Sequence, residues 1–217
     1  MVINMLREDI KEFINTIPKD VTIVAATKYV GAKEMLELYN NGIKNYGENR
    51  VEPFLEKYEQ LKDYKDIKWH FIGHLQRNKC KDIINKIDYL HSLDSLKLAK
   101  MIDENRTKPL DTFIEVSINL EENKNGVPYM DIDNFLSEVL KYKNINVVGF
   151  MMMAIKNDSD DDIKEQFKKL RLLKEECEKK FNITIPYLSM GMSNDYKDAI
   201  IEGATHIRLG RILWNML

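Results

Sequence analysis

A lysine directly follows one of the most apolar runs in the chain, and its amine could do covalent chemistry. The run covers residues 21–27 and the lysine is Lys28. If the run is a strand, alternation places Ala26 and Lys28 on one face, where the small alanine leaves room for a ligand. Burial lowers the pKa of a lysine amine, and a neutral amine can form a Schiff base with an aldehyde or ketone. A solvated charge is the simpler interpretation of a strand-end lysine, so Lys28 needs support from other residues.

Two segments near the end of the chain have the residue types of a phosphate site. Residues 189–195, with the sequence SMGMSND, precede a helix expected over residues 196–202. Ser193 is placed to cap that helix while free N–H groups face an anion. Further on, Gly210 lets the backbone approach a ligand closely, and Arg211 could add charge. Either segment alone fits ordinary turn chemistry, but together with Lys28 they indicate an aldehyde that carries a phosphate ester.

Arg208 bears on the kind of chemistry such a ligand could undergo. By alternation it shares a strand face with His206 and Gly210, which directs its guanidinium toward the ring of a phosphate-anchored cofactor. An arginine stays protonated, so it donates to a pyridine nitrogen but does not favour protonation of that nitrogen as a carboxylate would. The ring is then a weak electron sink. This argues against aminotransferase chemistry and suits racemase-like proton transfer or storage of the cofactor.

The elements that must position these residues follow a repeated strand and helix pattern. Apolar, β-branched runs alternate with segments of helical periodicity, which predicts an α/β fold, a (β/α)8 TIM barrel. The expected strands are residues 21–27, 44–46, 67–72, 89–91, 112–116, 147–151, 184–188 and 206–209, and the main helices 33–41, 50–61, 95–106, 132–141 and 161–180. An extra N-terminal helix, about residues 4–17, is expected to cap the barrel bottom. The phosphate loops then follow strands seven and eight, where TIM barrels often bind phosphate.

Length, charge and cysteine content limit the class of protein. The chain has 217 residues, with 33 Lys and Arg against 35 Asp and Glu, which gives a net charge of −2. We expect a single domain over residues 1–217 that binds neither nucleic acid nor an anionic membrane. Cys80 and Cys177 show no CxxC spacing, which fits a reducing compartment. The N-terminus lacks the pattern of a signal peptide and no apolar run approaches the roughly 20 residues that span a bilayer, so a cytoplasmic protein is expected.

Two features that invite a metal interpretation are better explained otherwise. His70 and His74 lie four residues apart, but Gly73 and the strand-like run before it make a continuous helix unfavourable, and the glutamate of an HExxH motif is missing. The acidic run at residues 158–162 lacks the glycine and terminal glutamate of a calcium loop and reads as a helix start. We therefore expect no metal site.

At this point the residues resemble a known family, the pyridoxal 5'-phosphate (PLP) homeostasis proteins, which are similar to the barrel domain of bacterial alanine racemase. The resemblance runs through most of the chain. It rests on ATK at residues 26–28, YGEN at 46–49, WHFIGHLQRNK at 69–79, LSMGMS at 188–193 and RLG at 208–210, in the family's order.

The resemblance implies a fold-type III PLP barrel and a role for each matching residue. PLP would be held as a Schiff base on Lys28, with Ser193 and the Gly210 backbone at the phosphate, Arg208 near the pyridine nitrogen and Asn49 lining the pocket. The family implies a carrier or regulator in PLP (vitamin B6) homeostasis and amino and keto acid balance, without established turnover. The chain departs from the family pattern at Arg211, where a small hydroxyl residue is usual, which leaves one phosphate contact open.

Three functions remain separable by experiment. The leading one is a PLP-binding homeostasis protein, which we expect to be a monomer with PLP-dependent apoenzymes as possible recipients. The second is a fold-type III enzyme such as a weak amino-acid racemase. In the racemase the second acid/base comes from an additional domain of a partner subunit, and the chain stops at Leu217, so we expect very weak racemase activity. The third, a Schiff-base aldolase or phosphosugar isomerase, predicts no visible chromophore.

Overall fold

The structure, a computed structural model, describes residues 4–118, 125–155 and 159–216 and is built around a closed sheet of parallel strands. Around the barrel the strands follow the order β2, β3, β4, β5, β6, β8, β9 and β10, and β10 pairs with β2 to close the ring. Their bounds are Thr22–Ala26, Asn45–Glu48, Lys68–Phe71, Tyr89–Leu93, Leu110–Ser117, Ile145–Met151, Tyr187–Ser189 and His206–Leu209. The predicted TIM barrel is confirmed.

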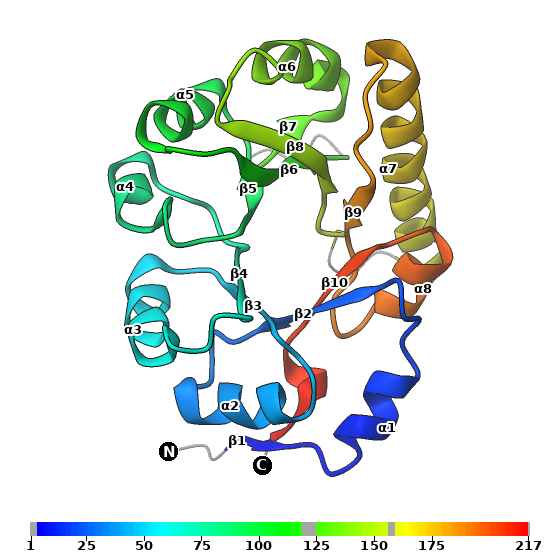
Figure 1. Cartoon of the computed structure of the whole chain (residues 1–217). Helices are drawn as coiled ribbons and strands as arrows, with labels where there is room; N and C mark the ends of the chain where they lie inside the picture. The colour runs from blue at the N-terminus through cyan, green and yellow to red at the C-terminus, as the bar shows by residue number, and fades with distance from the viewer. Residues whose placement is uncertain (1–3, 119–124, 156–158, 217) are drawn as a thin grey trace.

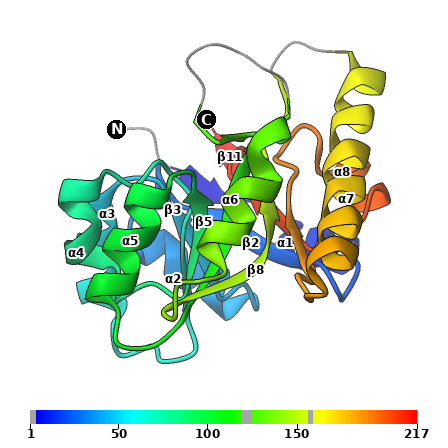
Figure 2. The same cartoon turned by 90° about the horizontal axis from the view of Figure 1, so that it is seen from above.

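Helices surround the barrel on its outside, as Figure 1 shows, and run along its flank in the turned view of Figure 2. They are α2 (Ala32–Asn40), α3 (Val51–Leu61), α4 (Cys80–Ile83), α5 (Leu96–Asn105), α6 (Ile132–Val139), α7 (Asp160–Phe181) and α8 (Tyr196–Ile201). Short 3-10 turns lie at Arg77–Lys79, Tyr129–Asp131 and Arg211–Leu213, and a two-residue strand, β7 (Val127–Pro128), pairs with β6. The helical periodicity therefore placed the main helices correctly, to within a few residues at each end.

The long helix α7 illustrates why these segments are helical. Its apolar stripe of Phe167, Leu170 and Leu173 is buried against the barrel, at the three-residue spacing of a helix face. The Ser159 hydroxyl accepts a hydrogen bond from the Asp162 N–H and caps the first turn, which is acidic as the helix dipole favours. The interpretation of the acidic run as a helix start is thus confirmed, except that position 158 lies outside the described residues.

The N-terminal segment differs from the prediction of one helix over residues 4–17. Strand β1 (Asn4–Leu6) pairs antiparallel with β11 (Trp214–Met216), and only α1 (Ile10–Asn15) is helical. The pairing satisfies the backbone of both chain ends through a partner about 200 residues away, which no local periodicity can reveal. The two termini consequently lie close together in Figure 1.

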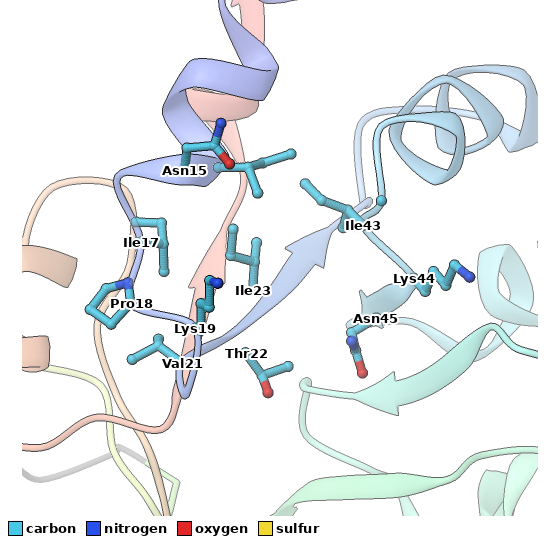
Figure 3. A pocket seen from close by; sticks show the side chains of 12 residues that line it. Asn15, Ile17, Pro18, Lys19, Val21, Thr22, Ile23, Ile43, Lys44 and Asn45 are labelled. Carbon is cyan, nitrogen blue, oxygen red and sulfur yellow. The ribbon is translucent and has the colours of Figure 1, made fainter.

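A cavity of about 310 Å³ lies at the lower end of the barrel, where the strands begin (Figure 3). The end of α1 and the starts of β2 and β3 form it, with Ile17, Thr22 and Asn45 among the lining residues. The helix itself packs on the outside of the barrel beside α8, where the Phe13 ring lies 6.1 Å from the Tyr196 ring, and only its end reaches the lower cavity. The prediction that it caps the barrel bottom is therefore wrong. Among the described residues, no helix is both long enough and apolar enough to cross a membrane.

The barrel interior is aromatic and polar. The Phe113 ring lies 4.4 Å from the His91 ring and 5.2 Å from the His206 ring, measured between centroids. The ring of His70 stacks on that of Tyr89 at 4.5 Å. Burial lowers the pKa of all three histidines, to about 4 for His206 and well below the ordinary value for the other two. The imidazoles inside the barrel are therefore neutral at neutral pH.

Candidate functional site

A second cavity, of about 640 Å³, opens at the upper end of the barrel, where the strands end. Four of the five residues predicted for the cofactor site line it: Lys28, Ser193, Arg208 and Gly210. They come from the segments that follow β2 and β9 and from the end of β10, which are neighbours around the barrel. Segments far apart in the sequence thus meet at one place, at the end where TIM barrels carry their reactive groups.

Lys28 lies two residues beyond the end of β2 and is exposed. Its Nζ atom is 4.7 Å from the centre of the Tyr29 ring. The expected desolvation of this amine is therefore not found. Ala26 and Lys28 line the same cavity, as the alternation predicts, but β2 ends at Ala26 and the Lys28 side chain beyond it is exposed.

A buried ion pair fixes the backbone just before Lys28. The Lys57 ammonium lies 2.5 Å from Glu48 Oε1 and donates to the Thr27 carbonyl at 2.7 Å. The Thr27 hydroxyl also donates to Glu48 Oε1. Glu48 is fully buried, and it lies in the YGEN segment that the sequence analysis used only as part of a resemblance. The sequence did not reveal the role of this cluster. The feature that could have indicated it is Lys57, a lysine on the buried face of α3.

Arg208 is 5% exposed, and protein acceptors hold its guanidinium in place. Nη1 donates to the Ser189 carbonyl at 2.8 Å and to the Ser189 hydroxyl at 2.7 Å, and Nη2 donates to the Met152 carbonyl at 2.8 Å. Burial lowers the pKa of Arg208 to about 10, while the negative charges of Glu115 and Asp195 act in the opposite direction. The group stays cationic at neutral pH, as the sequence analysis required.

Ser193 is in the site but does not cap α8, contrary to the prediction. The helix begins at Tyr196, so Asp195 holds the N-cap position and accepts a hydrogen bond from the Met192 N–H at 2.5 Å. Ser193 lies too early, and its hydroxyl instead accepts from the N–H groups of Gly210 at 3.3 Å and Ile212 at 3.5 Å. This hydroxyl thus joins the loops that follow β9 and β10.

Gly210 leaves open space beside the cavity. A Cβ atom there would meet only Ala26, at 3.7 Å from Ala26 Cβ, which is ordinary van der Waals contact. The space beside Gly210 is therefore open toward the cavity. Arg211 lines the same cavity with an exposed side chain.

Asn49 is the predicted residue that does not line this cavity. It is half-buried, and its backbone lies so close to Gly73 that a Cβ on that glycine would be 2.3 Å from the Asn49 carbonyl oxygen. The close contact holds the loops after β3 and β4 together. A direct role of Asn49 at the ligand stays a prediction.

The two histidines considered for metal binding point to different places. His70 is fully buried in the barrel, whereas His74 is partly exposed and its Nδ1 lies 3.0 Å from Asp94 Oδ2. Across the described parts of the chain, no group of three or more His, Cys, Asp or Glu side chains could hold a metal ion. Cys80 and Cys177 are both buried thiols outside any disulfide.

Comparison with known proteins places the chain in a family. Residues 3–216 match the family described as alanine racemase, N-terminal domain. The pyridoxal phosphate homeostasis protein of Aquifex aeolicus is 42% identical over 195 residues, covering 88% of this chain and 85% of the relative. The chain belongs to the pyridoxal phosphate homeostasis protein family. The relative of the same name from Synechocystis is 35% identical, and the match covers 94% of each protein.

Solved structures extend the likeness to three dimensions. PipY of Synechococcus elongatus, solved with PLP bound, is 28% identical, with a TM-score of 0.88 over 95% of this chain and all of PipY. An alanine racemase from Clostridium difficile has a TM-score of 0.77 at 14% identity over 97% of this chain and 57% of the racemase, which shows a shared fold. This member of the homeostasis family therefore shares the barrel fold of alanine racemase.

Proposed function

We propose that this protein binds PLP as a Schiff base on Lys28 and serves intracellular PLP (vitamin B6) homeostasis as a carrier, not as an enzyme with turnover. The whole chain, residues 1–217, acts as one PLP-binding domain in the cytoplasm, as a monomer that buffers the cofactor or passes it to PLP-dependent apoenzymes. Amino and keto acid balance would respond through those apoenzymes.

The meeting of Lys28, Ser193, Arg208 and Gly210 around one cavity is the observation that carries this proposal. Its volume of about 640 Å³ lies within the range of cofactor pockets, about 300–1,000 Å³. The amine, the guanidinium and the side-chain-free face of Gly210 match three parts of PLP: its aldehyde, its pyridine nitrogen and its phosphate. These groups suit PLP by their chemistry and by their place at one cavity.

A carrier role is supported by the charge state of Arg208. PLP supplies an electron sink when its ring nitrogen is protonated, and a group that only donates does not favour that protonation. Arg208 is such a donor, because its pKa of about 10 keeps it charged. An exposed Lys28 amine also suits reversible exchange with solvent or another protein.

Reduction of the purified protein with borohydride after soaking with PLP tests the proposal. We expect a visible absorbance band that disappears on reduction, with the label mapped by mass spectrometry to Lys28. Lys28→Ala should lose both the band and the label and keep its circular dichroism spectrum, because the exposed residue lies outside the packed core. Lys19→Ala, which removes another exposed lysine at the lower cavity, should behave as wild type. A colourless wild-type protein, or a label on another lysine, would overturn the proposal.

One observation favours weak racemase activity as a second candidate. Racemisation needs an acid/base on each face of a substrate, and Glu115 lies on β6, four strands from β2 in either direction around the barrel. Burial, aided by the charge of Asp94, raises the pKa of Glu115 to about 7, which suits proton exchange. Rapid formation of a D-amino acid by the PLP-loaded protein, lost in Glu115→Gln, would favour the enzyme over the carrier.

A further inference from the structure

A chain of hydrogen bonds crosses the barrel interior from Arg208 at the upper end to Asn45 at the lower end. It runs through side chains of four different strands, β10, β9, β5, β4, and ends on β3. The bonds are Arg208 Nη1 to Ser189 Oγ, 2.7 Å; Ser189 Oγ to His91 Nδ1, 2.8 Å; His91 Nε2 to His70 Nδ1, 2.8 Å; and His70 Nε2 to Asn45 Oδ1, 3.0 Å.

With the Asn45 oxygen facing His70, only one direction of donation satisfies every atom in this chain of hydrogen bonds. Arg208 can only donate and the Asn45 oxygen can only accept. His70 therefore carries its proton on Nε2 and accepts on Nδ1 from His91 Nε2–H. His91 then accepts on Nδ1 from the Ser189 hydroxyl, whose oxygen accepts from Arg208. Each imidazole uses both nitrogens in its neutral form, with no donor facing a donor.

Burial makes this arrangement rigid and keeps it neutral. His70, His91 and Ser189 are 0% exposed, and Arg208 is 5% exposed. A buried polar group without a partner is costly, so the loss of any one member would leave its neighbours unsatisfied. Burial also holds the pKa of both imidazoles well below the ordinary value, so they do not compete with Arg208 as cations.

The chain of hydrogen bonds ends on the side-chain amide of Asn45, and this decides whether it can conduct protons. A carboxylate at Asn45 could take up a proton from His70, but an amide oxygen holds none at neutral pH. The chain therefore orients its members and does not conduct protons. At the upper end it fixes Arg208, whose guanidinium donates three hydrogen bonds, two to Ser189 and one to Met152.

We infer that Asn45, His70, His91 and Ser189 are positioning residues that aim the Arg208 guanidinium into the upper cavity, where it would contact the ring of a pyridine ligand. The inference rests on the proposed function for the identity of that ligand. It extends the site from the cavity wall to the other end of the barrel, and it assigns a role to two histidines that the binding site does not itself use.

The first test uses the ligand-free protein, so that it does not depend on PLP. Nitrogen-15 NMR of the wild-type protein should show His70 and His91 as neutral Nε2–H tautomers, with both protons protected from exchange. Asn45→Asp should raise the pKa of His70, because a neighbouring negative charge favours the imidazolium form. Nδ1–H tautomers in the wild type would overturn the inference, whatever the protein binds.

The second test separates ring contacts from phosphate contacts. Pyridoxine 5'-phosphate has no aldehyde, so its affinity does not depend on condensation with Lys28, and inorganic phosphate reports the anchor alone. In His91→Phe we expect the affinity for pyridoxine 5'-phosphate to fall about tenfold or more, as for a lost hydrogen bond to a charged group, while phosphate affinity stays unchanged.

His206→Phe is the matched control. It removes another buried imidazole from the same barrel interior, and His206 Nδ1 contacts Thr205 Oγ1 at 3.0 Å instead of the chain. In His206→Phe the ratio of the affinity for pyridoxine 5'-phosphate to that for inorganic phosphate should equal the wild-type ratio. An equal fall in both variants would mean that any core change disturbs the site, and an unchanged ratio in His91→Phe would also defeat the inference. If wild type binds phosphate but not pyridoxine 5'-phosphate, the proposed function fails, and the NMR result still decides the positioning role.

Discussion

The two ends of the barrel each hold a cavity, but they treat charge in opposite ways. The Lys57 ammonium and Glu48, beside the upper cavity, are 2.5 Å apart, with side chains that are 9% and 0% exposed. The Lys44 ammonium and Asp66, beside the lower cavity, are also 2.5 Å apart, but their side chains are 44% and 48% exposed. Two ion pairs of equal length therefore stand in different surroundings.

This difference shows where the sequence is constrained. Buried charges are tolerated only with partners, so each buried charged group at the upper end requires others at fixed positions. At the lower end water can replace a lost partner, so substitutions there should be tolerated. The more constrained end is the one at which TIM barrels carry function.

Breaking the two ion pairs in parallel should give the largest difference between the ends. Lys57→Met leaves Glu48 buried and unpaired, and should lower the free energy of unfolding by about 3–5 kcal/mol. Lys44→Met leaves Asp66 in water and should not change stability measurably. Urea unfolding monitored by circular dichroism checks both variants. Equal losses in the two variants would show that burial is not what distinguishes the ends.

The pH dependence of stability should reveal the buried acid Glu115 near the upper end. Its pKa is raised to about 7, mainly by burial, while in the unfolded chain it titrates near the ordinary value of 4.5. Between these values the unfolded chain releases a proton that the folded chain keeps, so the unfolding free energy falls as pH rises, by about 3 kcal/mol at most.

Comparison of wild type with Glu115→Gln isolates this contribution. His206 acts in the opposite sense, since its folded pKa of about 4 means that stability is lost as pH falls from about 6.5 to 4. That loss should be common to both proteins. The difference in unfolding free energy between them should therefore shift in favour of the variant from pH 4.5 to 7.5, and a constant difference would contradict the burial of an acid at this position.

A pair of glycines tests the backbone at the two ends. Gly191, in the loop after β9, has φ of +89°, and a Cβ there would lie 2.6 Å from Ala199 Cβ. Gly42, at the lower cavity, has φ of +94° but nothing within 4 Å of a Cβ. Alanine at either position meets backbone strain of about 1–2 kcal/mol, and only Gly191→Ala adds a clash, of about 1–3 kcal/mol.

Thermal unfolding and phosphate binding check this pair. Gly191→Ala should be less stable than Gly42→Ala by about 2 kcal/mol, the middle of the clash range. It should also bind inorganic phosphate more weakly, because the clash displaces the loop that carries Ser193. If phosphate affinity falls equally in Gly42→Ala, the anchor does not lie at the upper end.

The sequence predicted which residues meet at the upper end of the barrel better than it predicted their burial and hydrogen bonds. The barrel, most of its elements and four cavity residues followed from periodicity and from strand ends, since these depend on residues close together in the chain. The burial of Lys28 depended on an inward-facing side chain, and the structure has the exposed alternative, because β2 ends at Ala26. The cap on α8 was wrong because the helix starts two residues later than Ser193 can reach.

Two sets of contacts between distant segments could not be predicted from the sequence. The pairing of β1 with β11 joins the two ends of the polypeptide. The hydrogen bonds that connect Arg208 to Asn45 link side chains of five strands. Each histidine in that chain looks, in sequence, like a polar residue in an apolar run. Only the closed barrel brings their ring nitrogens within hydrogen-bond distance, so the signal lies in the topology and not in any local pattern.

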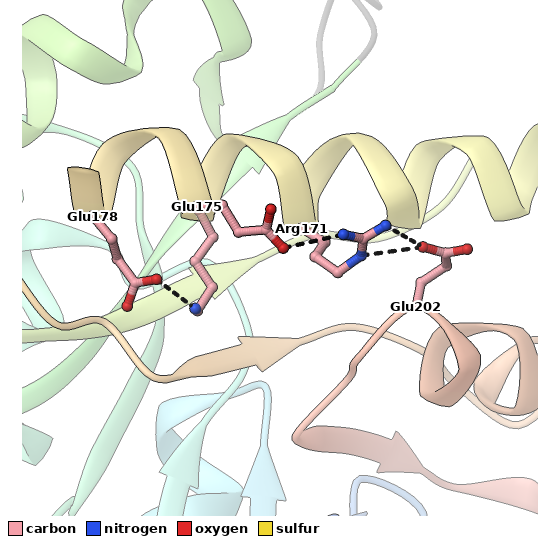
Figure 4. A network of polar contacts seen from close by, with 5 residues as sticks. Arg171, Glu175, Glu178 and Glu202 are labelled. Carbon is pink, nitrogen blue, oxygen red and sulfur yellow. Dashed lines mark hydrogen bonds and ion pairs between the residues drawn. The ribbon is translucent and has the colours of Figure 1, made fainter. Parts of the chain in front are cut away.

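Ion pairs on the outer surface provide a reference for the stability contributed by the ion pairs at the two ends. Arg171 on α7 lies 3.0 Å from Glu175 and 3.2 Å from Glu202 at the end of α8, as Figure 4 shows. These side chains are 20–42% exposed, so water screens them and can replace either partner. We expect Arg171→Ala to lower the unfolding free energy by about 1 kcal/mol or less, although it breaks two ion pairs where Lys57→Met breaks one. A loss as large as that of Lys57→Met, measured in the same urea series, would mean that the number of ion pairs matters more than their burial, and the contrast between the two ends of the barrel would lose its physical basis.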